Sequence, residues 1–465
     1  MPPSHAAAPD RAWRRAIPFS LSARRDAWTA LIIAAVGSVI AFGRLPGLVR
    51  GTVWAEDGAL FLPEFLADGW ATVFRSYSGY LHVGPRVITG VAASVAGVDL
   101  FAVAMTGVTC VIAGLCGGVA FLATRGVLVH LAPRIMVAAI PVAAPLLPVE
   151  VLGNATNVHW LGLWLTPWLM VCRPRRWSVS LGLAAVVLVA ALSEIEVVAF
   201  LPLIALTWRH RKSVPINAAL VLGVLAQVAT TLAYPRVRQP SDVRLTLVDL
   251  LDSTLAQTVL GAYTGDTRAV GESLASHGLL AGWAGLAPFV CAGIVAVIVA
   301  VRRWPGGARR RRWVTALGVC VLAAGCLFAA AAIMNPGPRF AMTSLDAQGL
   351  RDFLFSRYAV APSMFALAIP AFTTDALLAR RTRGISGPSR AGAARIAAVI
   401  VIALVLLVEV VSLRPAWTRR SDGPGWSSGV TAARESCATP GTQEVTIPLA
   451  PKGWLATIPC AHLRG

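Results

Sequence analysis

The chain has 465 residues, of which 56% are hydrophobic and only 14% are charged, and its formal net charge is +19. Because a soluble domain carries about a quarter charged residues, this composition excludes an ordinary soluble protein and predicts an all-α protein that crosses a membrane several times. The positive charge does not predict nucleic-acid binding, because the arginines cluster in short loops between apolar runs and form no basic stripe interleaved with aromatic residues.

Eleven apolar runs are candidates for transmembrane helices, each of which needs about 20 largely apolar residues. We predict spans near residues 27–43, 99–124, 126–148, 157–172, 177–192, 195–208, 214–233, 278–301, 313–333, 358–379 and 394–412. Arginine-rich loops face the cytoplasm in multi-span proteins, so the basic residues 1–26 are expected inside. An odd number of spans makes 27–412 the membrane domain and places the tail, residues 413–465, outside the plasma membrane.

The apolar stretch 177–208 is long for one span and short for two. A single span would place Glu194 and Glu196 near the middle of the bilayer, where each charge costs about 3 kcal/mol. It would also place the basic sequence RHRK, at 209–212, on the outer side. We therefore predict two short helices, with an outward bend at residues 193–196.

Two outer connections, residues 44–98 and 234–277, are long. The second contains LTLVDLLDSTLAQTVLGAYTG, whose apolar residues recur at helical spacing, which predicts an interfacial helix on the outer leaflet. The tail contains Cys437 and Cys460. Because the tail is expected in an oxidising compartment, we predict a disulfide between them; the alternative is two free thiols.

Polar side chains gather at the outer ends of the predicted spans. They lie in VWAEDGALFLPEF and FRSYSGYLHVGPR of the first outer loop, in the turn EVLGNATNVHW, at the predicted bend, and in the loop that ends with SRYAV. The candidate site residues are Glu56, Asp57, Tyr80, His82, Arg86, Asn154, Asn157, His159, Glu194, Arg339, Arg357 and Tyr358. The predicted cytoplasmic face has arginines and no comparable set.

This combination of side chains suits transfer of a group from a lipid-linked phosphate. A carboxylate can deprotonate an acceptor hydroxyl or hold a divalent ion, and arginines can clamp a phosphate leaving group in a bidentate manner. Aromatic rings can stack on sugars. Structural alternatives also exist: Asp57 as the cap of a short helix, His159 as an interface anchor and Glu194 as a solvated turn residue.

The acidic pair just after the first span resembles the GT-C superfamily of integral-membrane glycosyltransferases, which carry a catalytic acidic residue in that position. The sequences WAEDGALFLPEFLADGW, YSGYLHVGPR, NATNVHW and SRYAVAP resemble a group of actinobacterial membrane proteins of this type, over residues 27–412. The resemblance implies an inverting hexosyl- or pentosyltransferase that uses a polyprenyl-phosphate sugar. Its acceptor would be a glycan, lipid or protein of the cell envelope. The large soluble C-terminal domain of several branches is missing here, which affects acceptor recognition.

Within this interpretation Asp57 is the predicted general base, with Glu56 as its substitute. The donor phosphate would be held by Arg357 and Tyr358, with help from Arg339 or Arg86. The remaining candidates would line the sugar or acceptor pocket: Tyr80, His82, Asn154, Asn157, His159 and Glu194. Because the sequence has no metal-ligand spacing, no cofactor is predicted, and a carboxylate-bound divalent ion is the alternative.

Two other functions compete with this one. A transporter or flippase of lipid-linked or small solutes would place polar residues near the bilayer midplane, whereas here they lie at one end of the spans. A non-catalytic protein of envelope assembly would be expected to lose the acidic pair, which this chain retains as Glu56 and Asp57.

Overall fold

The computed structural model describes residues 19–236, 242–304, 306–379 and 388–464. These residues form a largely helical protein whose named strands make two short antiparallel hairpins: β1 (Ser76–Tyr77) with β2 (Tyr80–Leu81), and β3 (Glu444–Pro448) with β4 (Leu455–Pro459). Eight helices in the described ranges are long and apolar enough to cross a membrane. The predicted helical, multi-pass character is therefore confirmed.

The long apolar helices are α1 (Phe19–Gly43), α5 (Phe101–Ala123), α6 (Leu131–Ala143), α11 (Val214–Ala233), α14 (Leu280–Arg303), α15 (Ala308–Met334), α17 (Val360–Leu378) and α18 (Pro388–Val411). The short helix α7 (Leu147–Glu150) follows α6 in the chain and is counted with it as one candidate span. Their burial differs strongly. The apolar part of α17 is 94% buried, whereas those of α14 and α18 are 17% buried. Helix α17 is thus central in the bundle, and α14 and α18 lie at its periphery, where lipid would cover them.

The three other predicted spans are shorter helices. They are α8 (His159–Val171), α9 (Trp177–Ala191) and the pair η4 (Ile195–Leu203) and α10 (Ile204–Thr207). A helix of 13 residues, the length of α8, extends about 20 Å and falls short of the roughly 30 Å hydrocarbon core. Nearly every side chain of α8 is buried inside the bundle. Eight long helices are therefore observed, and a total of eleven crossings stays a prediction.

The bend at residues 193–196 lies where α9 ends and η4 begins. The side chain of Glu194 accepts a hydrogen bond from the backbone N–H of Glu196, 3.0 Å away, and so caps η4. Helices α9 and η4 are separate elements, as the cost of burying two carboxylates in one continuous span predicts.

Small residues allow the closest helix packing in the bundle. A Cβ atom at Gly114 of α5 would lie 2.3 Å from the backbone oxygen of Ala34 in α1, and one at Gly118 would lie 2.6 Å from that of Ala30. Gly114 and Gly118 are one turn apart, so they form a flat strip against α1. Such strips let membrane helices approach closely, which holds the N-terminal helix in place.

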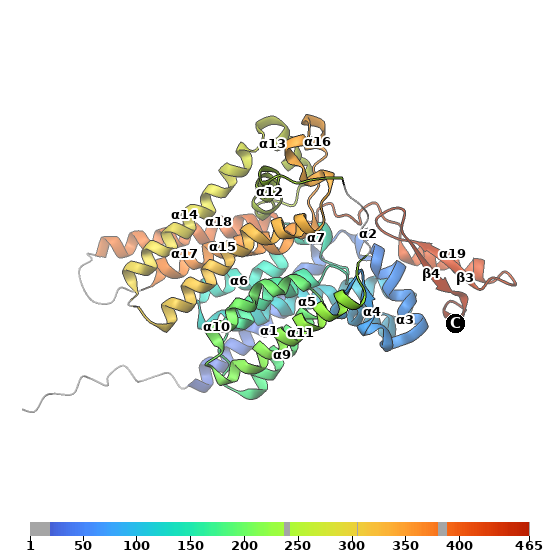
Figure 1. The fold of residues 1–465 in the computed structure, drawn as a ribbon, viewed down its shortest axis with the longest axis horizontal. Coiled ribbons are helices and arrows are strands. Elements are labelled where there is room, and N and C mark those ends of the chain that lie inside the picture. The colour runs from blue at the N-terminus through green and yellow to red at the C-terminus, as the bar shows by residue number, and fades with distance from the viewer. Residues whose placement is uncertain (1–18, 237–241, 305, 380–387, 465) are drawn as a thin grey trace, which may run out of the picture.

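The first outer loop is folded rather than extended. After α2 (Gly47–Arg50) it contains the π-helical turn η1 (Asp57–Phe61), α3 (Leu62–Asp68), the 3-10 turn η2 (Gly69–Phe74), β1, β2 and α4 (Val83–Ala96). The second long connection contains α12 (Leu247–Thr254), the turns η6 (Leu255–Val259) and η7 (Leu260–Ala262), and α13 (Thr267–His277). These helices gather beside α16 (Ala347–Arg351) at one edge of the molecule in Figure 1.

The C-terminal tail packs against the start of the first outer loop. It contains α19 (Trp426–Cys437) and the β3–β4 hairpin, and Cys437 forms a disulfide with Cys460, as the sequence predicts. The backbone N–H of Ala55 donates to the carbonyl of Ala450 at 2.6 Å, and that of Ala450 donates to Val53 at 2.9 Å. Figure 1 shows α3, α4, α19, β3 and β4 together at one end of the bundle.

Candidate functional site

Four connections meet around one open cavity of about 220 Å³. They are the β1–β2 hairpin, the turn before α8, the bend between α9 and η4, and the loop before α17, joined by the ends of α11 and α15. The cavity is lined by Tyr77, Ser78, Gly79, Tyr80, Thr156, His159, Trp160, Glu194, Ile195, Glu196, Thr231, Arg236, Met334, Asn335, Arg357 and Tyr358.

The β1–β2 hairpin presents Tyr77 and Tyr80 to this cavity. Its two loop residues, Ser78 and Gly79, have φ values of 49° and 85°, as a two-residue type I′ hairpin turn requires. A Cβ atom at Gly79 would also lie 2.8 Å from the backbone nitrogen of Arg236. Glycine at this position therefore allows both the turn and the close approach of the chain that follows α11.

His82 ties three of the four connections together. Its ring is fully buried, with Nδ1 3.0 Å from the carbonyl oxygen of Ser193 and Nε2 3.0 Å from that of Thr156. The ring also stacks on Tyr77, with centroids 5.2 Å apart. Burial lowers the pKa of His82 to about 4, against the effect of its two carbonyl contacts. His82 thus supports the cavity from behind and is not part of its lining.

Asp57 also lies behind the cavity. Its side chain has no exposed surface; one oxygen accepts the N–H of Ala155 at 2.8 Å, and the other accepts the N–H and the hydroxyl of Thr156 at 2.8 and 2.5 Å. Burial raises the pKa of Asp57 to about 6, although these hydrogen bonds oppose the shift. Through these hydrogen bonds Asp57 stabilises the turn that leads to His159.

Glu56 lies at the edge of the cavity, behind two of its lining residues. Its Oε1 accepts a hydrogen bond from the hydroxyl of Tyr77 at 3.2 Å and lies 3.7 Å from Nη1 of Arg357. Its Oε2 is buried without a hydrogen-bond partner. A buried carboxylate oxygen without a partner is costly in a folded protein and is typical of functional sites. Of the acidic pair, Glu56 contacts Tyr77 and Arg357 of the cavity lining and keeps one oxygen without a partner.

Arg357 stands between two carboxylates. Its Nη1 lies 3.7 Å from Glu56 and 3.7 Å from Oε1 of Glu150, whose Oε2 lies 3.7 Å from Nε of Arg419. These distances are within ion-pair range and too long for hydrogen bonds. The Arg357 side chain is 29% exposed, and the ion pairs hold its guanidinium by charge at distances too long for hydrogen bonds.

His159 and Glu194 form a buried pair in the cavity lining. Nε2 of His159 lies 3.1 Å from Oε2 of Glu194, and its Nδ1 lies 2.6 Å from the carbonyl oxygen of Thr156. The second oxygen of Glu194 accepts the N–H of Glu196. Burial raises the pKa of Glu194 to about 7. A carboxyl group with a pKa near neutrality beside an imidazole can both give and accept a proton.

The structure brings together only part of the predicted set. Five of the predicted residues line the cavity: Tyr80, His159, Glu194, Arg357 and Tyr358. Asn154 and Asn157 lie in the supporting turn, where both side-chain amides donate to the carbonyl oxygen of Glu150. Arg86 is buried in an ion pair with Glu64 and stacks on Phe61. Arg339 is exposed over the ring of Phe340, outside the lining.

Two arginines of the tail were not predicted. Arg419 approaches Glu150, and the buried Arg420 donates to the carbonyl oxygens of Leu152 and Gly153 at 3.0 and 2.8 Å. Arg420 therefore fixes the turn that carries the cavity residues. A sequence signal existed, because the positive-inside rule makes arginines unusual in a segment that is predicted to lie on the outer side of the membrane.

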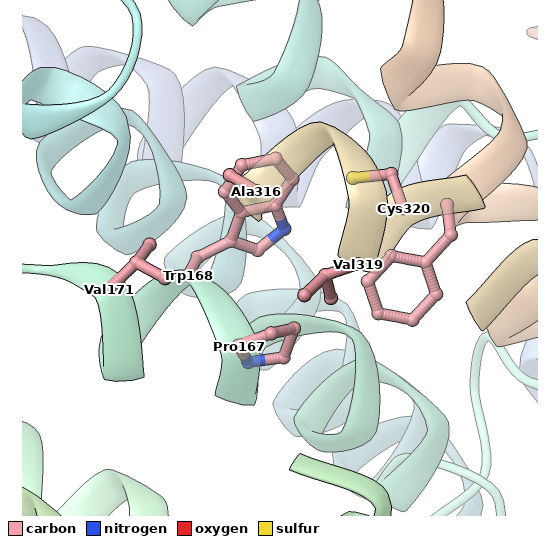
Figure 2. A pocket seen from close by; sticks show the side chains of 7 residues that line it. Pro167, Trp168, Val171, Ala316, Val319 and Cys320 are labelled. Carbon is pink, nitrogen blue, oxygen red and sulfur yellow. The ribbon is translucent and has the colours of Figure 1, made fainter. Parts of the chain in front are cut away.

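A second pocket lies inside the bundle and has a different character. Its cavity is about 10 Å³, no more than about one water molecule, and its lining is apolar. Figure 2 shows Pro167, Trp168 and Val171 of α8 facing Ala316, Val319 and Cys320 of α15. This pocket is a packing gap between helices, and it offers no group for chemistry.

Neither a metal site nor a related protein indicates the function of the 220 Å³ cavity. Among the residues that the structure describes, no group of three or more His, Cys, Asp or Glu side chains could hold a metal ion. Comparison of the sequence with protein-family models gives no match, and comparison with curated proteins gives no significant one. The cavity geometry is therefore the main basis for assigning a function.

Proposed function

We propose that the protein is an inverting glycosyltransferase of the outer face of the plasma membrane, using a sugar carried on a polyprenyl monophosphate. The acceptor would be a glycan, lipid or protein of the cell envelope. The N-terminus would lie in the cytoplasm and the tail outside, with the eight long helices, α8, α9 and η4–α10 as eleven membrane segments. The resemblance of the sequence around Glu56 and Asp57 to GT-C enzymes supports this proposal.

The observation that carries the proposal is the position of Arg357 between Glu56 and Glu150 in the wall of an open cavity. A phosphate can take the place of a carboxylate beside a guanidinium and form two parallel hydrogen bonds with it. Since the ion pairs of Arg357 are 3.7 Å long, the exchange would break no short hydrogen bond. The movement of Arg357 to a donor phosphate would also release the carboxylate of Glu56.

Glu56, and not Asp57, is the proposed general base. All the hydrogen bonds of Asp57 hold the backbone and hydroxyl of residues 155–156, whereas Oε2 of Glu56 has no partner. In the reaction, the acceptor oxygen forms a bond with C1 of the sugar and its proton passes to Glu56. The bond from C1 to the phosphate oxygen breaks, and its electron pair leaves on the polyprenyl phosphate, beside Arg357.

The aromatic lining suits a sugar. Tyr77, Tyr80, Trp160 and Tyr358 all line the cavity, and Trp160 and Tyr358 contact each other edge to face with centroids 5.8 Å apart. These rings would pack against the apolar faces of a sugar ring while Glu196 accepts hydrogen bonds from its hydroxyl groups.

Transfer in proteoliposomes tests this function. The purified protein is incubated with radiolabelled polyprenyl-phosphate mannose, glucose, galactose or arabinose and with an extract of envelope glycans and lipids. We expect one donor to give a labelled product. Arg357→Lys should lower the rate by at least about 100-fold, because lysine keeps the positive charge and lacks the planar guanidinium that forms two parallel hydrogen bonds with a phosphate. Arg351→Lys, in an exposed pair with Glu272, is the matched control and should act like the wild type. No transfer from any donor would reject the function.

A further inference from the structure

The contact between His159 and Glu194 requires a proton at a defined position. The carbonyl oxygen of Thr156, 2.6 Å from Nδ1 of His159, can only accept a hydrogen bond, so Nδ1 carries a hydrogen. Nε2 then faces Oε2 of Glu194 at 3.1 Å. A bare nitrogen lone pair against a bare carboxylate would be repulsive, so this contact holds one further proton. Because both residues are buried, the proton belongs on the carboxyl, which leaves the two groups uncharged.

We propose that His159 and Glu194 act as a general acid, which gives this shared proton to the phosphate leaving group. The inference rests on the proposed transferase function and adds a second proton-transfer group to it. Both residues line the same cavity as Arg357, the proposed phosphate ligand. The acid and the proposed phosphate ligand thus share one cavity, and Arg357 is also paired with Glu56, the base.

The proton balance of the reaction is complete with this pair. As the bond between C1 and the phosphate oxygen breaks, that oxygen takes the electron pair and receives the proton from between Oε2 and Nε2. Glu194 is left ionised beside a neutral His159, with two lone pairs facing each other. Because this state is unfavourable, the pair recovers a proton from water while Glu56 loses the proton that it took from the acceptor.

The surroundings of Glu194 favour the protonated form near neutral pH. Burial is the dominant influence and raises the pKa of Glu194 to about 7, while the charge of Arg357 opposes it. Other titratable and charged groups also face the pair from the elements packed around it: Tyr77, Tyr80, His82, Glu196, Arg236 and Tyr358.

Infrared difference spectroscopy locates the proton without any assay of activity. At pH 6 the spectrum of the wild type minus that of Glu194→Gln should contain a carboxylic-acid carbonyl band, and the same difference above pH 8 should lack it. Asp57, whose pKa is about 6, is present in both proteins and cancels in this difference. The glutamine amide can still donate to Nε2 of His159, so this variant keeps the contact and the fold. Glu272→Gln, which changes an exposed carboxylate outside the cavity, is the control and should retain the band.

The pH dependence of transfer tests the use of that proton. In the wild type the rate should fall as the pH rises through about 7, the pKa of Glu194. Glu194→Gln should lose about 100-fold in rate at pH 6 and should show no fall between pH 7 and 9, because its amide has no proton to lose. Glu272→Gln should keep the wild-type profile.

The outcomes separate the two proposals. A wild-type protein that shows the band and transfers no sugar contradicts the proposed function, and the catalytic use of the proton fails with it. A wild-type protein that transfers sugar while Glu194→Gln keeps both the full rate and the alkaline fall contradicts the general-acid role alone. Absence of a Glu194-dependent band at pH 6 shows that the carboxyl is ionised and also contradicts it.

Discussion

Nη1 of Arg357 lies 3.7 Å from Oε1 of Glu56, although the two residues are far apart in the sequence. Glu56 follows the first long helix, α1, and Arg357 comes just before α17. Because the Glu56 oxygen also accepts a hydrogen bond from Tyr77, the ion pair joins the first outer loop to the loop before α17. An anionic ligand that attracts Arg357 would change the surroundings of Glu56 at the same time. In the proposed reaction, this one contact would couple binding of the donor to activation of the acceptor.

Replacement of Glu56 should abolish transfer while the fold is kept. Glu56→Gln retains an oxygen for the hydroxyl of Tyr77 and cannot take up a proton. We expect a loss of about 100-fold or more in rate, as for removal of a general base, with a thermal midpoint close to that of the wild type. Initial rates in proteoliposomes and unfolding in detergent measure the two effects. A variant with more than about a tenth of the wild-type rate would rule out Glu56 as the base.

Replacement of Asp57 should lower the stability of the protein more than its catalytic rate. Asp57→Ala leaves two buried backbone N–H groups of residues 155–156 without their acceptors, so we expect a loss of about 1–3 kcal/mol in the free energy of unfolding. Asp57→Asn keeps one oxygen acceptor and should retain transfer within about tenfold of the wild type. If Asp57→Asn is as inactive as Glu56→Gln while remaining folded, Asp57 is the base and the role given to Glu56 is wrong.

The stability of the protein should depend on pH through Asp57. Its pKa is about 6 when folded, against an ordinary value of 3.8, so the folded state holds the proton more tightly. This group therefore contributes stability below pH 3.8 that is lost as the pH rises to about 6, by about 3 kcal/mol. The thermal midpoint of the wild type should fall over this range relative to that of Asp57→Asn. A constant difference between the two proteins from pH 4 to 7 would contradict the assignment.

The tail should stabilise the site through the disulfide. Cys437 and Cys460 are 23 residues apart, and closing a loop of this size contributes about 3 kcal/mol in the chain-entropy model. Because Ala450 is hydrogen-bonded to Val53 and Ala55, loosening of the tail should also displace Glu56. We expect the double replacement Cys437→Ser with Cys460→Ser to lower both the thermal midpoint and the transfer rate. Cys326→Ser, at an exposed free cysteine, is the control.

The general fold can be predicted because it depends on properties of short sequence segments. These are the length of each apolar run and the free-energy cost of placing a charged side chain in the bilayer. Run lengths give the long helices, and the cost of Glu194 and Glu196 in a bilayer predicts the bend where α9 ends. The arginine-rich loops predict a tail in an oxidising compartment, and the disulfide predicted from that placement, between Cys437 and Cys460, is present.

The orientation of single side chains could not be predicted in the same way. Glu56 and Asp57 are neighbours at the start of a π-helical turn, so a shift of one residue decides which of them faces the cavity. The pairing of His159 with Glu194, and of Ala450 with Val53, joins segments that are distant in sequence. Such contacts depend on tertiary packing, and no local pattern encodes them.

Labelling of a single cysteine tests most directly that the outer cavity binds a lipid-linked phosphate. In a background whose six free cysteines are replaced by serine, Ser78→Cys places a thiol in the cavity lining. Arg209→Cys places one after α10, on the predicted cytoplasmic side. In intact cells a membrane-impermeant maleimide should modify Ser78→Cys and leave Arg209→Cys unmodified. In proteoliposomes, a polyprenyl-phosphate sugar should slow the labelling of Ser78→Cys, and free polyprenol should not. Labelling of Arg209→Cys alone in cells, or equal rates with and without the donor, would contradict the account.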